Sequence, residues 1–266
     1  MIIYNDDEIA AARRSNQVVA RILDELGAMI KPGLRTRELD GYAEARTREL
    51  GAVPAFKGYR GYPATLCTSV NEEIIHGIPS DRVLREGDLV GIDFGVVLDG
   101  FYGDAARTFA VGAVSPLARR LTETAERAFF SGFETLREGA RLSDMSHAIQ
   151  AAVEAEGFSV IRQFVGHGVG RALHEDPQIP NFGAPGRGPR LRPGLILAVE
   201  PMIAAGGWEV EILDDGWTAV TADRSLSAHF EHTIALTAGG AEILSRTAPP
   251  GPSELWLAKE NRYAQG

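Results

Sequence analysis

Four acidic residues lie in segments that are otherwise apolar, and their types and spacing could support metal chemistry. Asp93 lies in residues 89–98, a run that is apolar on both faces and is therefore predicted to be a buried strand. Asp104, Glu200 and Glu231 lie in comparable segments. A buried carboxylate is costly unless a cation compensates it. A salt bridge to an arginine could do this for any one of the four, but four together favour bound metal cations.

Two of these acids are predicted to be neighbours across a hairpin. The dipeptide Asp99-Gly100 is typical of a two-residue hairpin turn between strands. With that turn, Asp93 faces Ala106, and Asp104 becomes the diagonal neighbour of Asp93 at about 7 Å. Because two carboxylates in this arrangement repel each other, a metal ion between them is the favoured interpretation. A bulge at Gly103 would break this register.

Histidines add a second kind of metal ligand. His167 and His174 lie in residues 166–177, where three glycines allow the backbone to bend closely round a site. The chain has only six histidines, so two in one glycine-rich segment indicate more than packing. His76 precedes residues 77–79, and it also fits the role of a simple turn residue.

The elements that must position these residues can be read from the apolar spacing. Helical spacing predicts four helices, over residues 6–30, 36–50, 116–137 and 143–156. Runs typical of β-strands lie between and after them, at residues 88–98, 101–111, 195–204, 208–213 and 229–237. Two pairs of helices that each precede strands predict a fold of the α+β class.

The chain also resembles itself at an offset of about 106 residues. Residues 84–93 align without gaps on residues 191–200, and each segment ends in a carboxylate. Chance similarity is the alternative explanation. Two related halves that bring acids to a common place predict an α+β domain with pseudo-two-fold symmetry. We expect one domain over residues 1–247, with halves at about 1–112 and 113–247.

Composition excludes several classes of protein. The 266 residues carry 36 acidic and 27 basic side chains, a net charge of −9, which argues against a specific nucleic-acid partner. Cys67 is the one cysteine, so no internal disulfide can form and a reducing cytoplasm is expected. The acidic start is unlike a signal peptide, and no apolar run is long enough to cross a membrane. Residues 248–266 are predicted to form a Pro-rich, extended C-terminal tail.

Five separated motifs then give the sequence a specific resemblance. The chain resembles the type I methionine aminopeptidases, in their short bacterial form, over roughly residues 5–245. The motifs that carry this resemblance stand in the family's order at residues 71–79, 100–104, 166–177, 200–201 and 231–233. The resemblance implies the pita-bread fold, in which a pseudo-two-fold symmetric antiparallel sheet core has flanking helices, for a single catalytic domain over residues 1–247. It also implies a metalloaminopeptidase that removes the N-terminal methionine of nascent proteins and peptides.

The resemblance also implies a dinuclear metal centre. Five residues would bind two divalent ions, with Asp104 and Glu231 bridging them: Asp93, Asp104, His167, Glu200 and Glu231. Four carboxylates and one imidazole form a hard, mostly oxygen donor set, unlike the Cys/His set of structural zinc. Such a set suits Mn²⁺, Fe²⁺ or Co²⁺, and Zn²⁺ is compatible with it. Two ions of this kind would share a water molecule and lower its pKa towards neutrality.

Further roles follow from the same resemblance. Glu200 would move the proton of the attacking water, His174 would hydrogen-bond the substrate carbonyl oxygen, and His76 would contact the scissile nitrogen. Methionine would occupy a deep apolar slot. Its expected walls are Phe56, Tyr59, Tyr62, Cys67, His76, Leu173, His174 and Trp217. Alternatively, the two tyrosines pack a turn and the cysteine is a small buried apolar residue.

Three positions depart from the family's usual pattern. Leu173 replaces a residue that is commonly aromatic, and Arg60 stands where many relatives have histidine. His229 is expected on the same strand face as Glu231, at a position where relatives often have glutamine. These departures put the shape of the substrate pocket and the properties of the metal centre in question.

Other functions stay open at this level. A prolidase or aminopeptidase P of the same fold would share the five ligands, but such relatives usually carry an N-terminal domain for which there is no room before residue 60. A catalytically silent binding module would typically have lost ligands. The arginine-rich residues 187–192 could support a transient contact with ribosomes. We expect a monomer, with peptide or nascent-protein N-termini as its partners.

Overall fold

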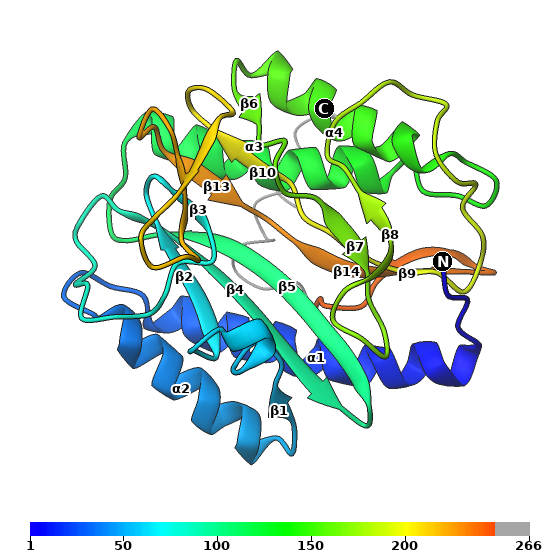
Figure 1. Cartoon of the computed structure of the whole chain (residues 1–266), viewed down its shortest axis with the longest axis horizontal. Helices are drawn as coiled ribbons and strands as arrows, with labels where there is room; N and C mark the ends of the chain where they lie inside the picture. Colours follow the sequence, from blue (N-terminus) through cyan, green and yellow to red (C-terminus); the bar gives the residue numbers. More distant parts are fainter. Residues whose placement is uncertain (248–266) are drawn as a thin grey trace, which may run out of the picture.

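Two pairs of helices lie on opposite sides of a layer of strands (Figure 1). The computed structural model describes residues 1–247, so the expected C-terminal tail lies outside the described residues. The helices are α1 (Asp6–Met29), α2 (Thr36–Glu49), α3 (Pro116–Phe133) and α4 (Leu142–Ala155). All four begin and end close to the predicted bounds, except that α3 ends four residues early, where the backbone forms turns from Thr135 to Gly132 and from Leu136 to Phe133.

Local capping explains where the longest helix begins. The Asn5 side chain accepts a hydrogen bond from the Glu8 backbone, and the Glu8 carboxylate accepts one from the Asn5 backbone, each at 3.0 Å. This reciprocal pair satisfies two of the free N–H groups at the helix start. Helix α3 begins in a related way, with the Ser115 hydroxyl accepting from Ala118 and with Pro116 in the first turn.

The strands within residues 1–247 form four sheets. One sheet joins β1, β4, β2 and β5, a second joins β13, β10 and β6, a third joins β11, β12 and β3, and a fourth has the order β15-β14-β9-β7-β8. Their bounds are β1 Val53–Pro54, β2 Leu66–Val70, β3 Glu73–Ile75, β4 Leu89–Leu98, β5 Phe101–Ala110, β6 Ser159–Val160, β7 Gly166–Gly168, β8 Glu175–Ile179, β9 Ile196–Val199, β10 Met202–Ala204, β11 Val210–Ile212, β12 Ala219–Thr221, β13 Ser227–His229, β14 His232–Thr237 and β15 Gly240–Ile243.

The hairpin of β4 and β5 has the predicted register. Asp93 pairs with Ala106 and Gly95 pairs with Asp104, and no bulge interrupts the pairing at Gly103. A side chain at residue 103 has no room, because a Cβ there would lie 2.8 Å from the Asn16 backbone nitrogen in α1. The hairpin therefore lies directly on α1, and the two aspartates are diagonal neighbours as expected.

Two of the predicted strands were wrong as continuous elements. The run at residues 195–204 divides into β9 and β10, and the run at residues 229–237 divides into β13 and β14. In both cases the chain leaves one sheet and enters another, because Pro201 has no N–H to donate and its carbonyl instead accepts from Phe230 at 3.1 Å. The expected strand at residues 208–213 is also shorter, as β11.

Equivalent hydrogen bonds confirm the internal repeat. In the first half Gly33 donates to the Leu84 carbonyl at 2.8 Å, and in the second half Gly139 donates to the Leu191 carbonyl at 2.9 Å. These four residues are related by the offset of about 106 residues seen in the sequence. The self-similarity is therefore structural, and the α+β fold with a pseudo-two-fold sheet core is confirmed.

Each half has its own apolar core. In the first, α1 and α2 pack on β4 through buried residues that include Ile22, Leu23 and Phe94. In the second, α3 and α4 pack on strands of the other sheets through Phe129 and Met145. Within residues 1–247, no helix combines the length and the apolar character that crossing a membrane would require.

Candidate active site

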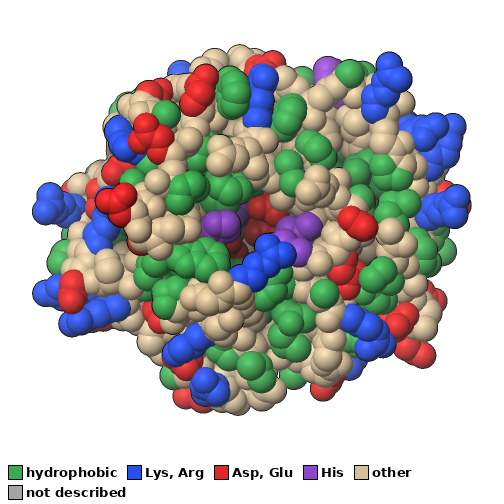
Figure 2. Space-filling view, viewed as in Figure 1, with side chains coloured by type: hydrophobic (Ala, Val, Ile, Leu, Met, Phe, Trp, Pro, Cys, Tyr) green, Lys and Arg blue, Asp and Glu red, His purple; other side chains and the backbone are tan. Residues whose placement is uncertain are grey.

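A cavity of about 200 Å³ lies between the two halves and opens to the surface. Figure 2 shows a central hollow with acidic and histidine side chains inside it and apolar side chains around it. Every residue proposed from the sequence as ligand, catalytic group or pocket wall lines this cavity. These residues are Phe56, Tyr59, Tyr62, Cys67, His76, Asp93, Asp104, His167, Leu173, His174, Glu200, Trp217 and Glu231.

The hairpin supplies two of the carboxylates. Asp93 on β4 keeps some exposed surface because it faces the cavity, whereas Asp104 on β5 is buried. The backbone around Asp104 is held on both sides, since its N–H donates to the Asn16 side chain at 3.2 Å and its carbonyl accepts from the Thr233 hydroxyl at 2.8 Å. Asp104 is thus fixed to α1 and to β14 at once.

The other two carboxylates lie at the points where strands change sheets. Glu200 follows β9, and its carbonyl accepts from the Asn181 side chain at 2.9 Å. Glu231 precedes β14, and its N–H donates to the Ala106 carbonyl of β5 at 2.8 Å. Both acids are buried, and both line the cavity between the halves.

His167 is placed by its glycine neighbours. A Cβ at Gly166 would lie 2.4 Å from the Ala198 carbonyl oxygen, and a Cβ at Gly168 would lie 2.6 Å from that of Asp176, so only glycine allows this close packing of strands. The His167 Nδ1 lies 3.0 Å from the Gly168 carbonyl. A neutral imidazole must donate there, which leaves Nε2 as an acceptor directed at the acids.

The ligand atoms lie close together. Nε2 of His167 is 3.5 Å from a Glu200 oxygen and 3.8 Å from an Asp104 oxygen. Single ligand atoms of Asp104, His167 and Glu231 all lie within 4.8 Å of one another, with all three residues buried. The arrangement therefore gathers metal-binding groups from β4, β5, β7 and the two sheet junctions round one point.

Electrostatics shows that these acids lack a protein cation. Burial raises the pKa of Asp93 to about 7. It also raises the pKa values of Asp104, Glu200 and Glu231 well above their usual range, and neighbouring carboxylates add to each effect. Among residues 1–247, their ion-pair partners are histidines, and no lysine or arginine pairs with them.

Individual oxygens of this cluster are also without hydrogen bonds. Asp93 Oδ1, Asp104 Oδ1 and Glu231 Oε1 are buried, and none has a donor among the described residues. A buried unsatisfied carboxylate oxygen costs free energy, whereas divalent cations prefer oxygen ligands in such a group. The salt-bridge alternative raised by the sequence is therefore not what is observed, and the donor set fits bound divalent cations.

Aromatic and apolar residues form the wall opposite the acids. Tyr62 is buried, and its hydroxyl donates to the carbonyls of Leu66 at 2.9 Å and Gly77 at 3.1 Å. Its ring lies edge-on to Trp217, with the ring centroids 5.1 Å apart. Cys67 is buried in the same cluster, where burial raises its thiol pKa well above the usual value. This wall is thus preorganised and uncharged.

Two histidines lie between the apolar wall and the acids. Burial lowers the pKa of His76 to about 4, and burial together with the positive charge of Arg60 lowers the pKa of His174. Nδ1 of His174 lies 2.8 Å from the Tyr59 hydroxyl. Both imidazoles are therefore neutral near pH 7 and can act as hydrogen-bond donors or acceptors towards a ligand.

The cavity also contains residues that sequence reasoning did not identify. Ile75, Phe164 and Val165 line it, and Phe164 packs edge-on against His76 at 5.8 Å between ring centroids. Phe164 and Val165 lie in a loop without periodic spacing, and the one signal that could have found them is their position just before Gly166. His229 lies as expected beside Glu231, with Nε2 3.9 Å from its carboxylate and 3.8 Å from that of Glu200.

Comparison with known proteins agrees with this geometry. Residues 10–238 match the model of metallopeptidase family M24. A methionine aminopeptidase from Clostridium perfringens is 51% identical over 92% of this chain and 98% of its own length. The crystal structure of methionine aminopeptidase from Thermotoga maritima has a TM-score of 0.91 at 46% identity, covering 93% of this chain and all of that one, 100%.

A more distant likeness concerns the fold alone. Prolidase from Pyrococcus furiosus has a TM-score of 0.76 at 23% identity, covering 92% of this chain and 66% of its own. The pita-bread fold expected from the sequence is thus confirmed by both kinds of structure. With the sequence matches spanning nearly the whole domain, the chain belongs to metallopeptidase family M24 and, within that family, to the methionine aminopeptidases.

Proposed function

We propose that this protein hydrolyses the peptide bond after the N-terminal methionine of peptides and nascent proteins, using two divalent cations held by Asp93, Asp104, His167, Glu200 and Glu231. The observation that carries the proposal is the convergence of four carboxylates, without a lysine or arginine partner in residues 1–247, on the floor of a cavity with an apolar wall. The names of its relatives support the same activity.

The five ligands would hold the cations between the two halves. Single ligand atoms of Asp104, His167 and Glu231 lie within 4.8 Å of one another, and the family resemblance implies that Asp104 and Glu231 would be the residues shared by both cations. When bound, such cations lower the pKa of a coordinated water and so supply a nucleophile near neutral pH. Mn²⁺, Fe²⁺ or Co²⁺ suit this donor set. The free α-amine of the substrate would also bind one of the cations.

Glu200 is the group that would move the proton of the water. It is buried, and burial together with the nearby Asp93 charge raises its pKa well above the usual range, which favours its protonated form when no cation is bound. Its oxygens also lie near two neutral imidazoles, those of His167 and His229. A carboxylate in this position can accept a proton from water and pass it to the leaving amine.

His174 would stabilise the charge that grows on the substrate carbonyl oxygen. We assign the Tyr59 hydroxyl as the donor to Nδ1 of His174, an assignment that places the proton of the neutral imidazole on Nε2 and makes Nε2 a hydrogen-bond donor. A single donor of this kind contributes about 2.7–4 kcal/mol to the transition state in hydrolases. His76, also neutral, would contact the scissile nitrogen from the opposite side.

Methionine would be selected by the apolar wall. Tyr62 and Trp217 present an edge-on aromatic pair, and Cys67 and Leu173 close the slot. A thioether side chain suits such a pocket because its polarisable sulfur packs favourably on aromatic rings. The slot is uncharged, so it would bind an apolar first residue in preference to a charged one.

One assay with two peptides tests the proposal. The protein is loaded with Mn²⁺, Fe²⁺ or Co²⁺ and incubated with a Met-Ala-Ser peptide and with a Xaa-Pro peptide. Release of methionine from the first peptide alone is the expected result. Cleavage of the second peptide alone would assign a prolidase activity, and the absence of cleavage with all three metals would favour a silent binding module.

The partner and the compartment belong to the same proposal. We infer that the protein encounters nascent N-termini in the cytoplasm. The buried free thiol of Cys67 supports this compartment, because a free thiol is stable in a reducing environment. A transient ribosome contact would use the arginines of residues 187–192, which are largely exposed beside α4.

A further inference from the structure

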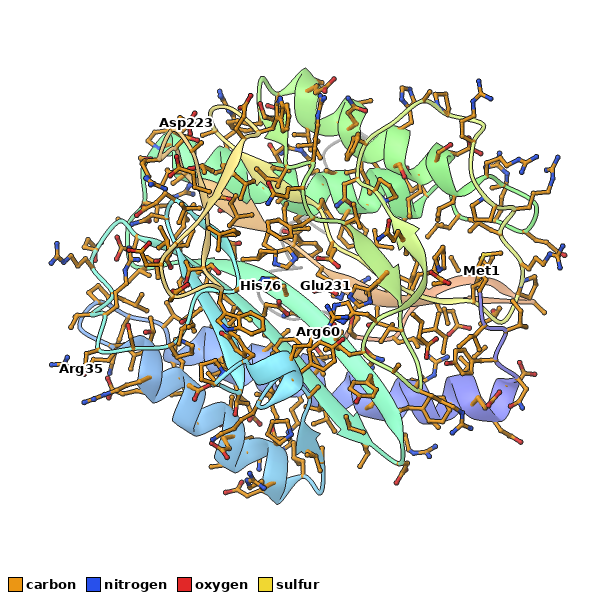
Figure 3. All side chains as sticks on the ribbon, in the orientation of Figure 1. Met1, Arg35, Arg60, His76, Asp223 and Glu231 are labelled. Atoms are coloured by element: carbon orange, nitrogen blue, oxygen red, sulfur yellow. The ribbon has the colours of Figure 1, made fainter. Side chains whose placement is uncertain are left out.

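One lining residue of the active-site cavity carries a permanent positive charge. Among the described residues, Arg60 is the single lysine or arginine that lines the cavity, and it is exposed at its mouth. Arg60, Glu231 and His76 all line this cavity, and their labels fall in the central part of the view in Figure 3. Neither the binding of methionine nor the binding of metal ions explains a positive charge at the mouth of the cavity.

The charge of Arg60 is available to a ligand. No carboxylate of residues 1–247 forms an ion pair with its guanidinium, which instead lies over the ring of Tyr59 at 5.3 Å from the centroid. Lys57, three residues earlier, is different, because its Nζ pairs with Glu44 at 2.7 Å. Stacking on an aromatic ring orients a guanidinium while leaving its N–H fork open to an anion.

Arg60 has a backbone conformation that is unfavourable for a residue with a side chain. Its φ of 50° lies in the left-handed region, between Gly58 at 88° and Gly61 at 89°. Such a conformation costs a residue with a Cβ roughly 1–2 kcal/mol, whereas glycine adopts it freely. Strain of this kind is typical of functional positions.

The position of Arg60 points to the part of a substrate that follows the cleaved bond. The acids and the apolar slot lie inside the cavity, so on the proposed function the first residue of a peptide would bind there and the following residues would leave through the mouth. The mouth is formed by Tyr59, Arg60 and His174, which line the cavity and keep exposed surface. The guanidinium would therefore lie beside the path of the second to fourth residues.

We propose that Arg60 forms a carboxylate-binding subsite at the mouth of the cavity, which favours substrates with an acidic group shortly after the N-terminal methionine. This inference rests on the proposed function. The carboxylate can belong to an Asp or Glu side chain at the third or fourth position, or to the free C-terminus of a very short peptide. The guanidinium of Arg60 can bind both oxygens of such a carboxylate through two parallel N–H groups.

The test compares kcat/KM for matched peptide amides. Met-Ala-Asp-Gly amide and Met-Ala-Asn-Gly amide differ by one charge, and Met-Ala-Ser is used both as free acid and as amide. We expect the wild-type enzyme to prefer the acidic member of each relevant pair by about twofold to fivefold, mainly through KM, as suits an exposed ion pair. A preference within the first pair would identify an acidic side chain as the group that binds Arg60. A preference within the second pair would identify the free C-terminus as that group.

Variants isolate the role of the guanidinium. Arg60→Gln should remove the preference, and Arg60→Lys should retain part of it, because the charge remains without the fork. The matched control is Lys57→Gln, which removes the same charge from the same loop but outside the cavity. A binding measurement independent of turnover is calorimetric titration of the Mn²⁺-loaded enzyme with Ala-Asp-Gly amide and Ala-Asn-Gly amide.

The outcomes separate this inference from the proposed function. Equal kcat/KM for acidic and neutral peptides in the wild type, or an equal preference in Arg60→Gln, overturns the carboxylate subsite. A preference lost equally in Lys57→Gln overturns it as well, because bulk charge would then be the cause. Failure of the wild type to release methionine from any of the peptides counts against the proposed function instead.

Discussion

At the scale of single residues, the role of Glu200 is the most direct test of the proposed chemistry. Glu200→Gln keeps the size of the side chain but removes its ability to carry a proton between water and amine. Because Glu200 is also a proposed metal ligand, the variant is assayed under conditions where calorimetry shows that Mn²⁺ is bound. We then expect kcat/KM for a Met-Ala-Ser peptide to fall by about 10²–10⁴-fold, the usual contribution of general acid–base catalysis. Thermal unfolding should show a folded protein, and Glu138→Gln on the exposed surface should keep full activity. Full activity in Glu200→Gln would remove this assignment.

A second residue-scale prediction separates two tyrosines of the same wall. Tyr59→Phe removes the hydroxyl that bonds His174 Nδ1, so the donor proton on Nε2 is no longer fixed. One net hydrogen bond of about 1 kcal/mol corresponds to roughly a fivefold loss of kcat. Tyr62→Phe instead removes bonds to two backbone carbonyls, and it should lower Tm with little change in kcat. The reverse pattern would mean that Tyr59 only packs the turn.

At the scale of elements, the contact between the hairpin and α1 positions Asp104. In Gly103→Ala the new Cβ would meet backbone atoms of Ser15 and Asn16 at 2.8 Å, which a helix cannot easily yield. We expect a loss of about 1–3 kcal/mol in unfolding free energy, as for overpacked cores, and weaker Mn²⁺ binding by calorimetry. The control is Gly41→Ala in α2, where the added Cβ meets nothing within 4 Å and should stabilise the helix. An unchanged Tm in Gly103→Ala would show that α1 does not constrain the hairpin.

The same hairpin explains how far the site could be predicted from the sequence. The two-residue turn at Asp99-Gly100 fixes the register by itself, so the proximity of Asp93 and Asp104 followed from local chemistry. The sheet junctions at Glu200 and Glu231 did not follow, because they depend on a contact between Phe230 and Pro201 that joins distant parts of the chain. Phe164 was not predicted because it lies in a loop, where no periodic spacing indicates which residues face the cavity.

At the scale of the whole molecule, the two related halves meet at one cluster of acidic residues. The first half contributes Asp93 and Asp104, and the second contributes His167, Glu200 and Glu231. Neither half alone holds four acids, so the full cost of concentrating negative charge arises where the halves pack together. Binding of cations should therefore stabilise the packing of the halves as well as the site, and the stability of the metal-free protein should depend on pH.

Two sets of buried groups set the sign of that dependence. The carboxylates have pKa values raised by burial, to about 7 for Asp93, so the folded state binds more protons than the unfolded state and stability falls as pH rises. The histidines act oppositely. Burial lowers the pKa values of His76 and His167 to about 4, so stability rises with pH until unfolded histidine is neutral, above about pH 6.5. Above that pH the carboxylates alone contribute.

We therefore expect the Tm of the EDTA-treated protein to fall as pH is raised from about 6.5 to about 8. Saturating Mn²⁺ should remove most of this slope, because cations bind the ionised carboxylates at both pH values and the folded state then releases few further protons. The gap in Tm between Mn²⁺-saturated and EDTA-treated samples should accordingly widen with pH in differential scanning calorimetry. Asp104→Asn, which removes one raised pKa, should reduce the slope of the metal-free protein. A gap that stays constant across this range would mean that the four acids are already compensated within the protein.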